Sequence, residues 1–565
     1  FSVFGVQTQV PDTVGDVGPS HYVQMVNTLY RVFDKQGNAL TPPRSLSSLF
    51  APLGSSSPCS TRNAGDPIVL YDPLADRWLL SQFCLLATPF NHQMIAISQT
   101  SDPTGAYFLY DFMMPNDKFP DYPKLGVWHD AYLMTDVQFE PLGPGYEGTG
   151  AFAFDRMKML QGDPSPSYIY FDLAPLDPGI GGVLPADLDG LVPPPAGSPA
   201  YFAGFRADEY GDPADALQIF EFKPDFTHPA SSTFTERPES RLAVPSFDPR
   251  TPPTIRVVEQ PPPATSTAYL DAIQDRLMHR LAYRNFGDHE SLVLNHTVNV
   301  GADPSTTAGH QAAVRYYELR RPLPSGAFSV TEAATFAPDS ANRWMGSAAQ
   351  DRQGDIAVGY SVSSTSIFPS IRYAGRLATD PPNGLFQGEA VLAAGTGSQR
   401  VATGRWGDYS AMAVDPSHDC TFWYTNEYYT LTSQQFSPSG WLTRIGSFKF
   451  PSCPPAPKGT LAGTVTRCDT GTPVPEASVQ IQGGYFRSTS SSGGFSMTLP
   501  PGTYEITVSR PALGAAVSGL LVVDGQTTDA SVCLAPAAVI VPHGVPTLAA
   551  ESCTPPNGGA HPGET

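Results

Sequence analysis

The sequence predicts an all-β protein: a seven-bladed β-propeller, with six or eight blades as alternatives, followed by a small C-terminal β-sandwich. The first observation is composition, since 59 Pro and 51 Gly among 565 residues interrupt helices and mark turns between strands. The second is a repeated unit of short apolar segments separated by turns, from about residue 20 to residue 450. The third is a change of composition after the proline-rich segment 450–459, where a smaller domain is expected to begin.

The repeated unit predicts a hairpin, because its two apolar strands are joined by Asp-Pro, Gly-Asp or similar steps that favour tight reversals. Each first strand is apolar along much of its length, as expected for the inner strand of a propeller blade; a stack of sandwiches is the competing architecture. The segment 1–10 is expected to complete the last blade. The clearest units are 66–83, 122–139, 280–298, 344–362 and 408–429, and the weaker ones are 21–40 and 201–222.

Two proline-rich inserts interrupt the repeat, at 179–200 and 250–267. Their stiff, extended backbone suits the wall of a groove or a solvent-exposed tether. The second insert leads into 270–281, whose apolar spacing predicts a short helix.

The chain is expected to divide into a propeller at 1–453, a linker at 454–458, a sandwich at 459–536 and a final stretch at 537–565. The sandwich segments PVPEASVQI and SGGFSMTLPPGTYEITV resemble the carboxypeptidase regulatory-like, or transthyretin-like, family. That resemblance implies a spacer or adhesion domain without catalytic residues. The final stretch resembles the opening of a further Ig-like repeat, with a disordered tail as the alternative.

The propeller also carries a resemblance, in the segments GDVGPSHYVQMVN, DYPKLGVWHDAY, YRNFGDHESLV and RWGDYSAMAVDPSHDCTFWYTNEYY. Across residues 10–453 these are similar to a group of secreted bacterial β-propeller proteins, and at the level of fold alone to sialidase-like propellers. The resemblance implies an extracellular propeller and brings no activity with it.

Charge and cysteine content indicate the compartment. With 33 Lys+Arg against 53 Asp+Glu the net charge is −20, which argues against nucleic acid as a partner. No run of about 18 apolar residues exists, so no membrane span is expected. Three disulfides would imply an oxidising compartment and a secreted or cell-surface protein, whereas buried free thiols in the cytosol are the alternative. The expected pairs are Cys59 with Cys84, Cys420 with Cys453 and Cys468 with Cys533, which leaves Cys553 over.

Charged residues stand immediately ahead of the predicted inner strands, near one mouth of the central channel. Guanidinium and carboxylate groups that converge there would bind anionic or polyhydroxyl ligands. The alternative is structural: Asp caps the turn before each strand, and Arg bridges neighbouring blades in ion pairs. The ligand-binding candidates are Arg280, Arg284, Arg343 and Arg405, and the carboxylates are Asp66, Asp121 and Asp408.

Catalytic and metal sites can be suggested on the same residues. The sequence lacks the GxSxG, P-loop and HExxH motifs, which leaves glycosidases, whose carboxylates come from distant strands. The sialidase resemblance would assign Arg280, Arg343 and Arg405 to a substrate carboxylate, Tyr409 and Glu427 to the nucleophile pair and Asp121 to the acid, but the Asp-box motif is absent. Asp408 is a further catalytic candidate. Asp66, Asp121 and Asp408 could instead hold a structural calcium ion.

The sequence therefore predicts an extracellular or cell-surface protein whose propeller binds a glycan or an extracellular protein. One alternative is a secreted carbohydrate-active hydrolase with its site at the channel mouth, and another is a self-assembling surface component. No cofactor other than calcium is suggested.

Overall fold

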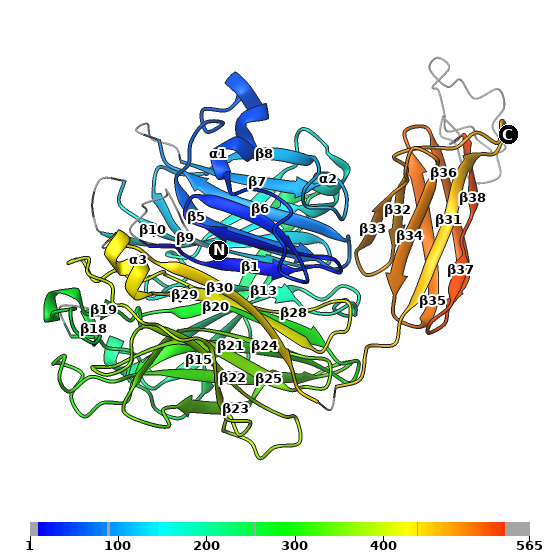
Figure 1. Ribbon diagram of the computed structural model, residues 1–565. Helices are drawn as coiled ribbons and strands as arrows, with labels where there is room; N and C mark the ends of the chain where they lie inside the picture. The colour runs from blue at the N-terminus through cyan, green and yellow to red at the C-terminus, as the bar shows by residue number, and fades with distance from the viewer. Residues whose placement is uncertain are drawn as a thin grey trace, which may run out of the picture.

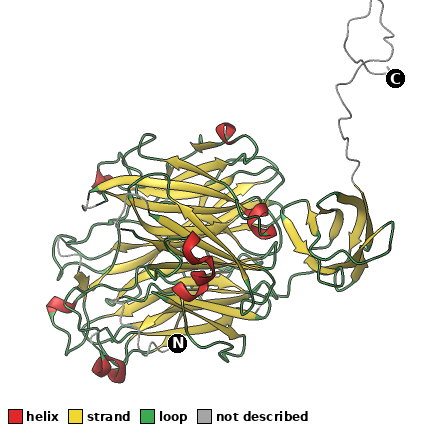
Figure 2. Cartoon of the chain, turned by 90° about the horizontal axis from the view of Figure 1, so that it is seen from above, coloured by secondary structure: helices red, strands yellow, loops and turns green. Residues whose placement is uncertain are grey.

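The computed structural model is all-β and describes residues 10–536, except 87–90, 142, 144, 253–255, 438 and 452. Figure 1 shows sheets stacked around a common axis and a small sandwich beside one end of their strands; Figure 2 shows the same two parts from above. The predicted class, a β-propeller followed by a sandwich, is confirmed. No helix among the described residues is long and apolar enough to cross a membrane.

The propeller strands pair in chain order into antiparallel groups, which are named here by their members. The first three are β1 (Val14–Val17) to β4 (Arg44–Ser45) with β2 (His21–Val26) and β3 (Leu29–Asp34); β5 (Gly65–Asp72), β6 (Arg77–Cys84), β7 (His92–Ser98) and β8 (Tyr107–Met113); and β9 (Phe119–Val127), β10 (Ala131–Phe139), β11 (Tyr146–Asp155) and β12 (Tyr168–Asp172).

The later groups follow the same order. They are β13 (Leu184–Leu188), β14 (Ala200–Arg206), β15 (Ala216–Lys223), β16 (Thr233–Glu236) and β17 (Leu242–Ala243); β20 (Leu277–Asn285), β21 (His289–Asn299), β22 (Ala312–Pro322) and β23 (Ser329–Phe336); β24 (Asn342–Gln350), β25 (Ile356–Ser363), β26 (Ser370–Arg376) and β27 (Glu389–Ala393); and β28 (Ala411–Val414), β29 (Thr421–Tyr428) and β30 (Leu442–Lys449).

The short elements lie in the connections. They are the β18–β19 pair (Arg256–Val258 and Leu270–Asp271), helices α1 (Leu46–Phe50), α2 (Arg156–Gln161) and α3 (Leu431–Phe436), and the 3₁₀ turns η1 (Ala51–Ser56), η2 (Asp208–Tyr210), η3 (Pro229–Ser231) and η4 (Ser266–Ala268).

The first strand of each group lies on the axis. In the order β1, β5, β9, β13, β20, β24, β28, each of these inner strands contacts the next, and β28 contacts β1, so the ring is closed. β13 and β20 even pair as parallel strands, which joins two groups into one sheet. Because of this joined sheet, the number of blades stays a prediction.

The inner strands are buried because both of their faces are covered by neighbouring blades. Every residue of β24 and all but Asp66 in β5 are buried. The fully buried Trp78, Trp128 and Trp344 fill spaces between groups, and each such ring removes a large apolar area from water.

The predicted helix at 270–281 is wrong: these residues form β19, a turn and the first part of β20. The apolar positions 270, 273, 277, 278 and 281 have helical spacing. In β20, however, all residues except the last are buried, so polar residues such as His279 and Arg280 lie inside with the apolar ones. A strand buried on both faces has no alternating pattern by which the sequence could distinguish it from a helix.

The three predicted disulfides are formed: Cys59–Cys84, Cys420–Cys453 and Cys468–Cys533. They fit the oxidising compartment expected from the sequence. The segment 1–9, expected to complete the last blade, and the stretch 537–565 with Cys553 lie outside the described residues.

The sandwich wraps its strands into one curled sheet with the order β33-β32-β35-β36-β38-β31-β34, and β37 also pairs with β31. The strands are β31 (Gly459–Arg467), β32 (Ser478–Ile481), β33 (Tyr485–Ser488), β34 (Gly494–Leu499), β35 (Gly502–Arg510), β36 (Leu513–Val522), β37 (Thr527–Asp529) and β38 (Val532–Pro536).

The sandwich is docked on the propeller through β33 and the turn before it. The hydroxyl of Tyr485 donates to the carbonyl of Leu191 at 2.5 Å. The N–H of Phe486 donates to the carbonyl of Leu74 at 3.2 Å. The buried guanidinium of Arg156 donates to the carbonyl of Gly484 at 2.8 Å. Leu74 and Leu191 belong to turns that leave inner strands, so the sandwich lies at the end of the propeller where these strands finish.

Candidate functional site

A polar cleft lies at the opposite end of the channel, where the inner strands begin. Its volume is about 390 Å³, within the range of ligand pockets. In Figure 1 the β18–β19 pair, which carries the cleft residue Asp271, lies at the end of the propeller away from the sandwich. The charged lining residues come from separate blades and loops: Asp121, Arg250, Asp271, Asp275, Arg276, Arg405 and Asp408.

The predicted carboxylates meet at this mouth through a series of hydrogen bonds between blades. The N–H of Asp408 donates to Asp12 at 2.9 Å, and the other oxygen of Asp12 accepts from the side-chain amide of Asn27. Asn27 in turn accepts from the N–H of Asp66 at 3.0 Å, and Asp66 accepts from the N–H of Tyr122 at 3.1 Å. Four inner strands are thereby fixed relative to one another at the cleft.

Burial and mutual repulsion set the protonation of these acids. Burial, then the charge of Asp408, raises the pKa of Asp12 to about 7. The same two causes raise the pKa of Asp121, and burial with Asp12 and Asp121 raises that of Asp66 well above its usual range. Burial raises the pKa of Asp271 to about 6. The mouth thus holds groups that exchange protons near neutral pH.

A buried lysine supplies the positive charge beneath the cleft. The ammonium of Lys124 lies 3.3 Å from the ring centre of Tyr122 and 4.1 Å from that of Tyr409. Burial lowers the pKa of Lys124 to about 7, against the opposing charges of Asp66 and Asp408. On its other side Tyr122 is covered by the guanidinium of Arg276, at 4.7 Å. The tyrosine rings are therefore held by cation–π contacts beneath the cleft.

Tyr409 and Glu427 lie under the mouth and do not line the cleft. Both are 1% exposed. The hydroxyl of Tyr409 donates to the carbonyl of Pro67 at 2.9 Å, and Glu427 accepts from the N–H of Gly407 at 2.5 Å. Burial raises the pKa of Glu427 well above its usual range. Their contacts hold the chain around Asp408 in place.

Of the four candidate arginines, the structure brings only Arg405 to the cleft. Arg280 lies inside the channel between Asp187 and Asp189, at 2.6 and 2.8 Å. Arg284 pairs with Asp419, at 2.8 Å, near the sandwich.

Arg343 lies within its own blade, between Asp339 and Glu389, at 2.8 Å from each. The three arginines assigned by the sialidase resemblance therefore do not meet, and that assignment is corrected. Arg280 is absent from the cleft because β20 begins at Leu277, three residues before it. The arginine at the mouth is therefore Arg276.

The guanidinium groups at the cleft are already neutralised. Arg405 pairs with Asp408 at 2.6 Å, Arg276 with Asp275 at 2.8 Å and Arg250 with Asp248 at 2.9 Å. The cleft therefore offers many hydrogen-bonding groups but no surplus positive charge.

The sequence analysis did not identify four residues of the mouth: Asp12, Lys124, Asp271 and Arg276. Asp12 had a signal, because Pro11-Asp12 repeats the Pro-Asp or Gly-Asp step found at Asp66, Asp121 and Asp408. Lys124 had none, since a lysine inside a strand usually indicates an exposed face.

Among the described residues, the groups of side chains that could bind a metal lie outside the cleft. Asp66, Asp121 and Asp408 do not form a group of ligand atoms within 4.8 Å of one another, and the ammonium of Lys124 lies among their charges. These donors suit calcium poorly, and a calcium ion there stays a prediction. The groups that do form are Asp208, Glu209 and Asp215; Asp351, Cys420 and Cys453; and Cys59, His92 and Asp111.

Comparisons with solved structures gave distant likenesses. A hypothetical selenium-binding protein from Sulfolobus tokodaii has 8% identity and a TM-score of 0.37, over 67% of this chain and 77% of that one. An α-L-arabinofuranosidase from Fusarium graminearum has 7% identity and a TM-score of 0.31, over 79% and 94%. A neuraminidase-like protein of influenza subtype N11 from a flat-faced bat has 8% identity and a TM-score of 0.31, over 68% and 94%. Scores this low carry no argument about function.

No curated protein matched the sequence. One family model did, and its match covers residues 460–535, the span of the sandwich. The sandwich is a carboxypeptidase regulatory-like domain.

Proposed function

We propose that this chain is an extracellular protein and that its propeller binds a carbohydrate in the cleft at the channel mouth. The observation that carries this proposal is the cleft itself, in which carboxylates and paired guanidinium groups from separate blades face one cavity of about 390 Å³. Such groups donate to and accept from sugar hydroxyls. Because each cleft arginine already has a carboxylate partner, a neutral sugar suits the cleft better than an acidic one.

Tyr210 supports the same ligand class. It lines the cleft and is 52% exposed, so its ring offers an apolar face at the rim. Sugars present apolar faces as well as hydroxyls, and an aromatic ring beside polar groups recognises both. A protein partner and self-association remain predictions from the sequence.

Hydrolysis is the second candidate, and one observation favours it. Asp121 and Asp408 line the same cleft, and burial with the charge of Asp408 raises the pKa of Asp121. A protonated carboxyl group beside a second carboxylate is the pair that glycosidases use. Asp121 would act as the acid and Asp408 as the base or nucleophile.

The test is incubation of the full chain with neutral and acidic oligosaccharides, with retained ligand and released sugar measured separately by mass spectrometry. Asp121→Asn and Asp408→Asn are compared with the wild type, and Glu505→Gln, on an exposed position of the sandwich, is the matched control. Retention of neutral sugars, weakened at least tenfold by both cleft variants only, supports binding. Release abolished by both supports hydrolysis. If no sugar of the panel is retained or released, the proposal is contradicted.

A further inference from the structure

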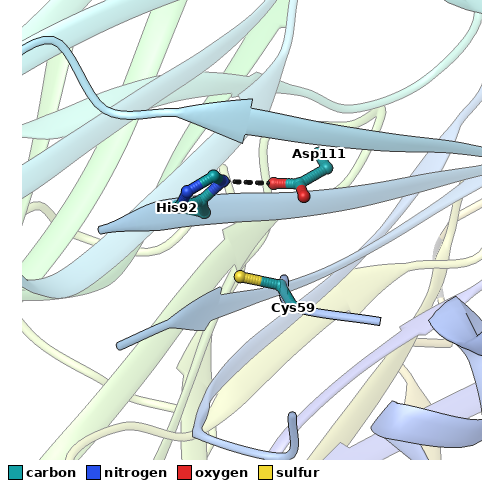
Figure 3. A group of neighbouring side chains, drawn as sticks. All are labelled: Cys59, His92 and Asp111. Carbon is teal, nitrogen blue, oxygen red and sulfur yellow. Dashed lines mark hydrogen bonds and ion pairs between the residues drawn. The ribbon is translucent and has the colours of Figure 1, made fainter. Parts of the chain in front are cut away.

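A second group of chemically capable side chains lies outside the lining of the cleft, on the sheet β5–β8 and the segment before it. Figure 3 shows Cys59, His92 and Asp111 converging in the sheet β5–β8, and each offers a ligand atom within 4.8 Å of the others. Cys59 comes from the segment before β5, His92 is the first residue of β7 and Asp111 lies on β8. Cys84, bonded to Cys59, is opposite His92 across the β6–β7 ladder.

These four residues make a donor set that the disulfide conceals. A disulfide sulfur is a poor metal ligand, whereas a thiolate is a strong one. A dithiol gives two electrons and two protons to the Cys59–Cys84 bond and becomes a disulfide itself; a phosphine gives the two electrons and becomes a phosphine oxide, with water supplying the oxygen and the two protons. Either reductant yields two thiols. Two thiolates, an imidazole and a carboxylate are four donors of the kind that bind zinc in a tetrahedron.

We propose that Cys59, Cys84, His92 and Asp111 bind one zinc ion when the Cys59–Cys84 disulfide is reduced. Binding replaces the two thiol protons by the metal, so two protons leave for each ion bound. The disulfide and the metal are therefore alternative states of one site, and the proposal is independent of the carbohydrate cleft.

The surroundings hold these donors in place. Asp111 is hydrogen-bonded to Nδ1 of His92 at 2.6 Å and accepts from the hydroxyl of Ser57 through its other oxygen. The N–H of Cys59 donates to the same hydroxyl at 3.0 Å. The contacts with Ser57 orient Cys59 and Asp111 before a metal arrives. An ion bound to both His92 and Asp111 would take the place of the proton that they now share.

Burial also favours the site. The side chains of His92 and Asp111 are 12% and 13% exposed, and both cysteines are fully buried. The Cα atoms of Cys59 and Cys84 lie 6.0 Å apart, so rotation of the two cysteine side chains is enough to separate their sulfurs around an ion.

The other disulfides provide internal comparisons. Asp351 lies with Cys420 and Cys453, so that pair would have a carboxylate but no histidine among the grouped ligands. Cys468 and Cys533 belong to no such group in the described part of the chain. Zinc should therefore protect Cys59 and Cys84 most, and Cys468 and Cys533 least.

The experiment reduces the full chain with a phosphine, adds or omits one equivalent of zinc, and then alkylates the thiols with iodoacetamide. Peptide mass spectrometry gives the alkylation rate of each cysteine in the same sample. We expect zinc to slow alkylation of Cys59 and Cys84 at least tenfold and to leave Cys468 and Cys533 unchanged. His92→Ala should remove the protection, and His289→Ala, at a histidine that begins β21 and pairs with Asp288 outside this group, should keep it.

Cobalt gives a second readout that does not depend on reactivity. Reduced chain with one equivalent of cobalt should show the thiolate charge-transfer band and the strong visible bands of a tetrahedral ion, and the oxidised chain should show neither. Equal alkylation of Cys59 and Cys84 with and without zinc would overturn the proposal. So would protection that survives in His92→Ala.

Discussion

Two buried carboxylates at the mouth link neighbouring blades, since each accepts a backbone N–H from another blade. Asp12 accepts from Asp408, and Asp66 accepts from Tyr122. Their positions are therefore determined by the ring of blades, and their charge states by burial within it. A substitution at either residue should disturb the ring of blades as well as the charge at the mouth.

Asp136 allows the effect of burial on charge to be measured away from the cleft. It is 1% exposed, and its Oδ1 accepts from the side chain of Gln138 and the N–H of Gly150 at 3.0 and 3.1 Å. Burial raises its pKa from 3.8 to about 7. Between these values the folded chain binds more protons than the unfolded chain, so stability is greatest below the unfolded pKa and falls as pH rises.

Asp136→Asn should remove this loss, because the amide resembles the protonated acid. The wild type should lose up to about 1.4 kcal/mol per pH unit from this group between pH 4 and pH 7, and the variant should not. Urea unfolding across this range measures the difference in slope. Asp117→Asn, at an exposed position before β9, is the control. Parallel curves for wild type and Asp136→Asn would contradict the prediction.

At the scale of elements, the inner strands share a distortion near the mouth. Asp12, Asp66, Tyr122 and Met345 all have positive φ, between 44° and 54°. The registers of β5, β9, β20 and β24 with their neighbours shift in the same region. Bulges of this kind turn side chains away from the sheet, and they direct the first residues of each inner strand toward the cleft.

The sequence predicted most of the repeated hairpins because they carry their own turn residues, but it missed the inner strand β13, which lies in the segment 179–200 expected to be a loop. It predicted Asp66, Asp121, Asp408 and Arg405 at the mouth for the same reason, since each stands just ahead of an inner strand. The sequence prediction failed at β20, because it placed the start of this strand too late and therefore named Arg280 instead of Arg276 as the residue at the mouth. Strand starts depend on the bulges and on contacts with other blades, neither of which has a local pattern.

The turn before β33 can be tested as the element that docks the sandwich. Gly484 has φ of +88°, and a Cβ there would overlap the carbonyl oxygen of His129. Gly471 has φ of +68° with open space around it. Gly484→Ala should therefore separate the domains, whereas Gly471→Ala adds only similar backbone strain of about 1 kcal/mol.

Limited proteolysis reports this separation at the 454–458 linker. We expect cleavage of Gly484→Ala at least tenfold faster than that of the wild type, with Gly471→Ala close to the wild type. Equal rates for both variants would mean that docking does not depend on this contact.

At the scale of the whole molecule, the channel has different partners at its two ends. The cleft is open at the end where the inner strands begin, and the sandwich packs on the turns at the other end through Tyr485, Phe486 and Gly484. One continuous group of buried apolar side chains runs from the propeller, including Trp128, into the sandwich, including Val465 and Tyr485. The sequence indicated only a proline-rich linker at 454–458, because contacts between domains leave no local pattern in the sequence.

This shared core should make the two domains unfold together. Calorimetry of the wild type should give a single transition, because the sandwich cannot unfold without exposing propeller surface. Tyr485→Ser removes a buried ring and its hydrogen bond to Leu191, at a cost of about 3 kcal/mol by analogy with other large-to-small changes in cores. We expect it to divide the transition into two, with the sandwich melting first, and to leave sugar retention at the distant cleft unchanged. Leu521→Ser, at a side chain 58% exposed on the sandwich, should keep a single transition. Two transitions in the wild type would show that the shared core does not couple the domains.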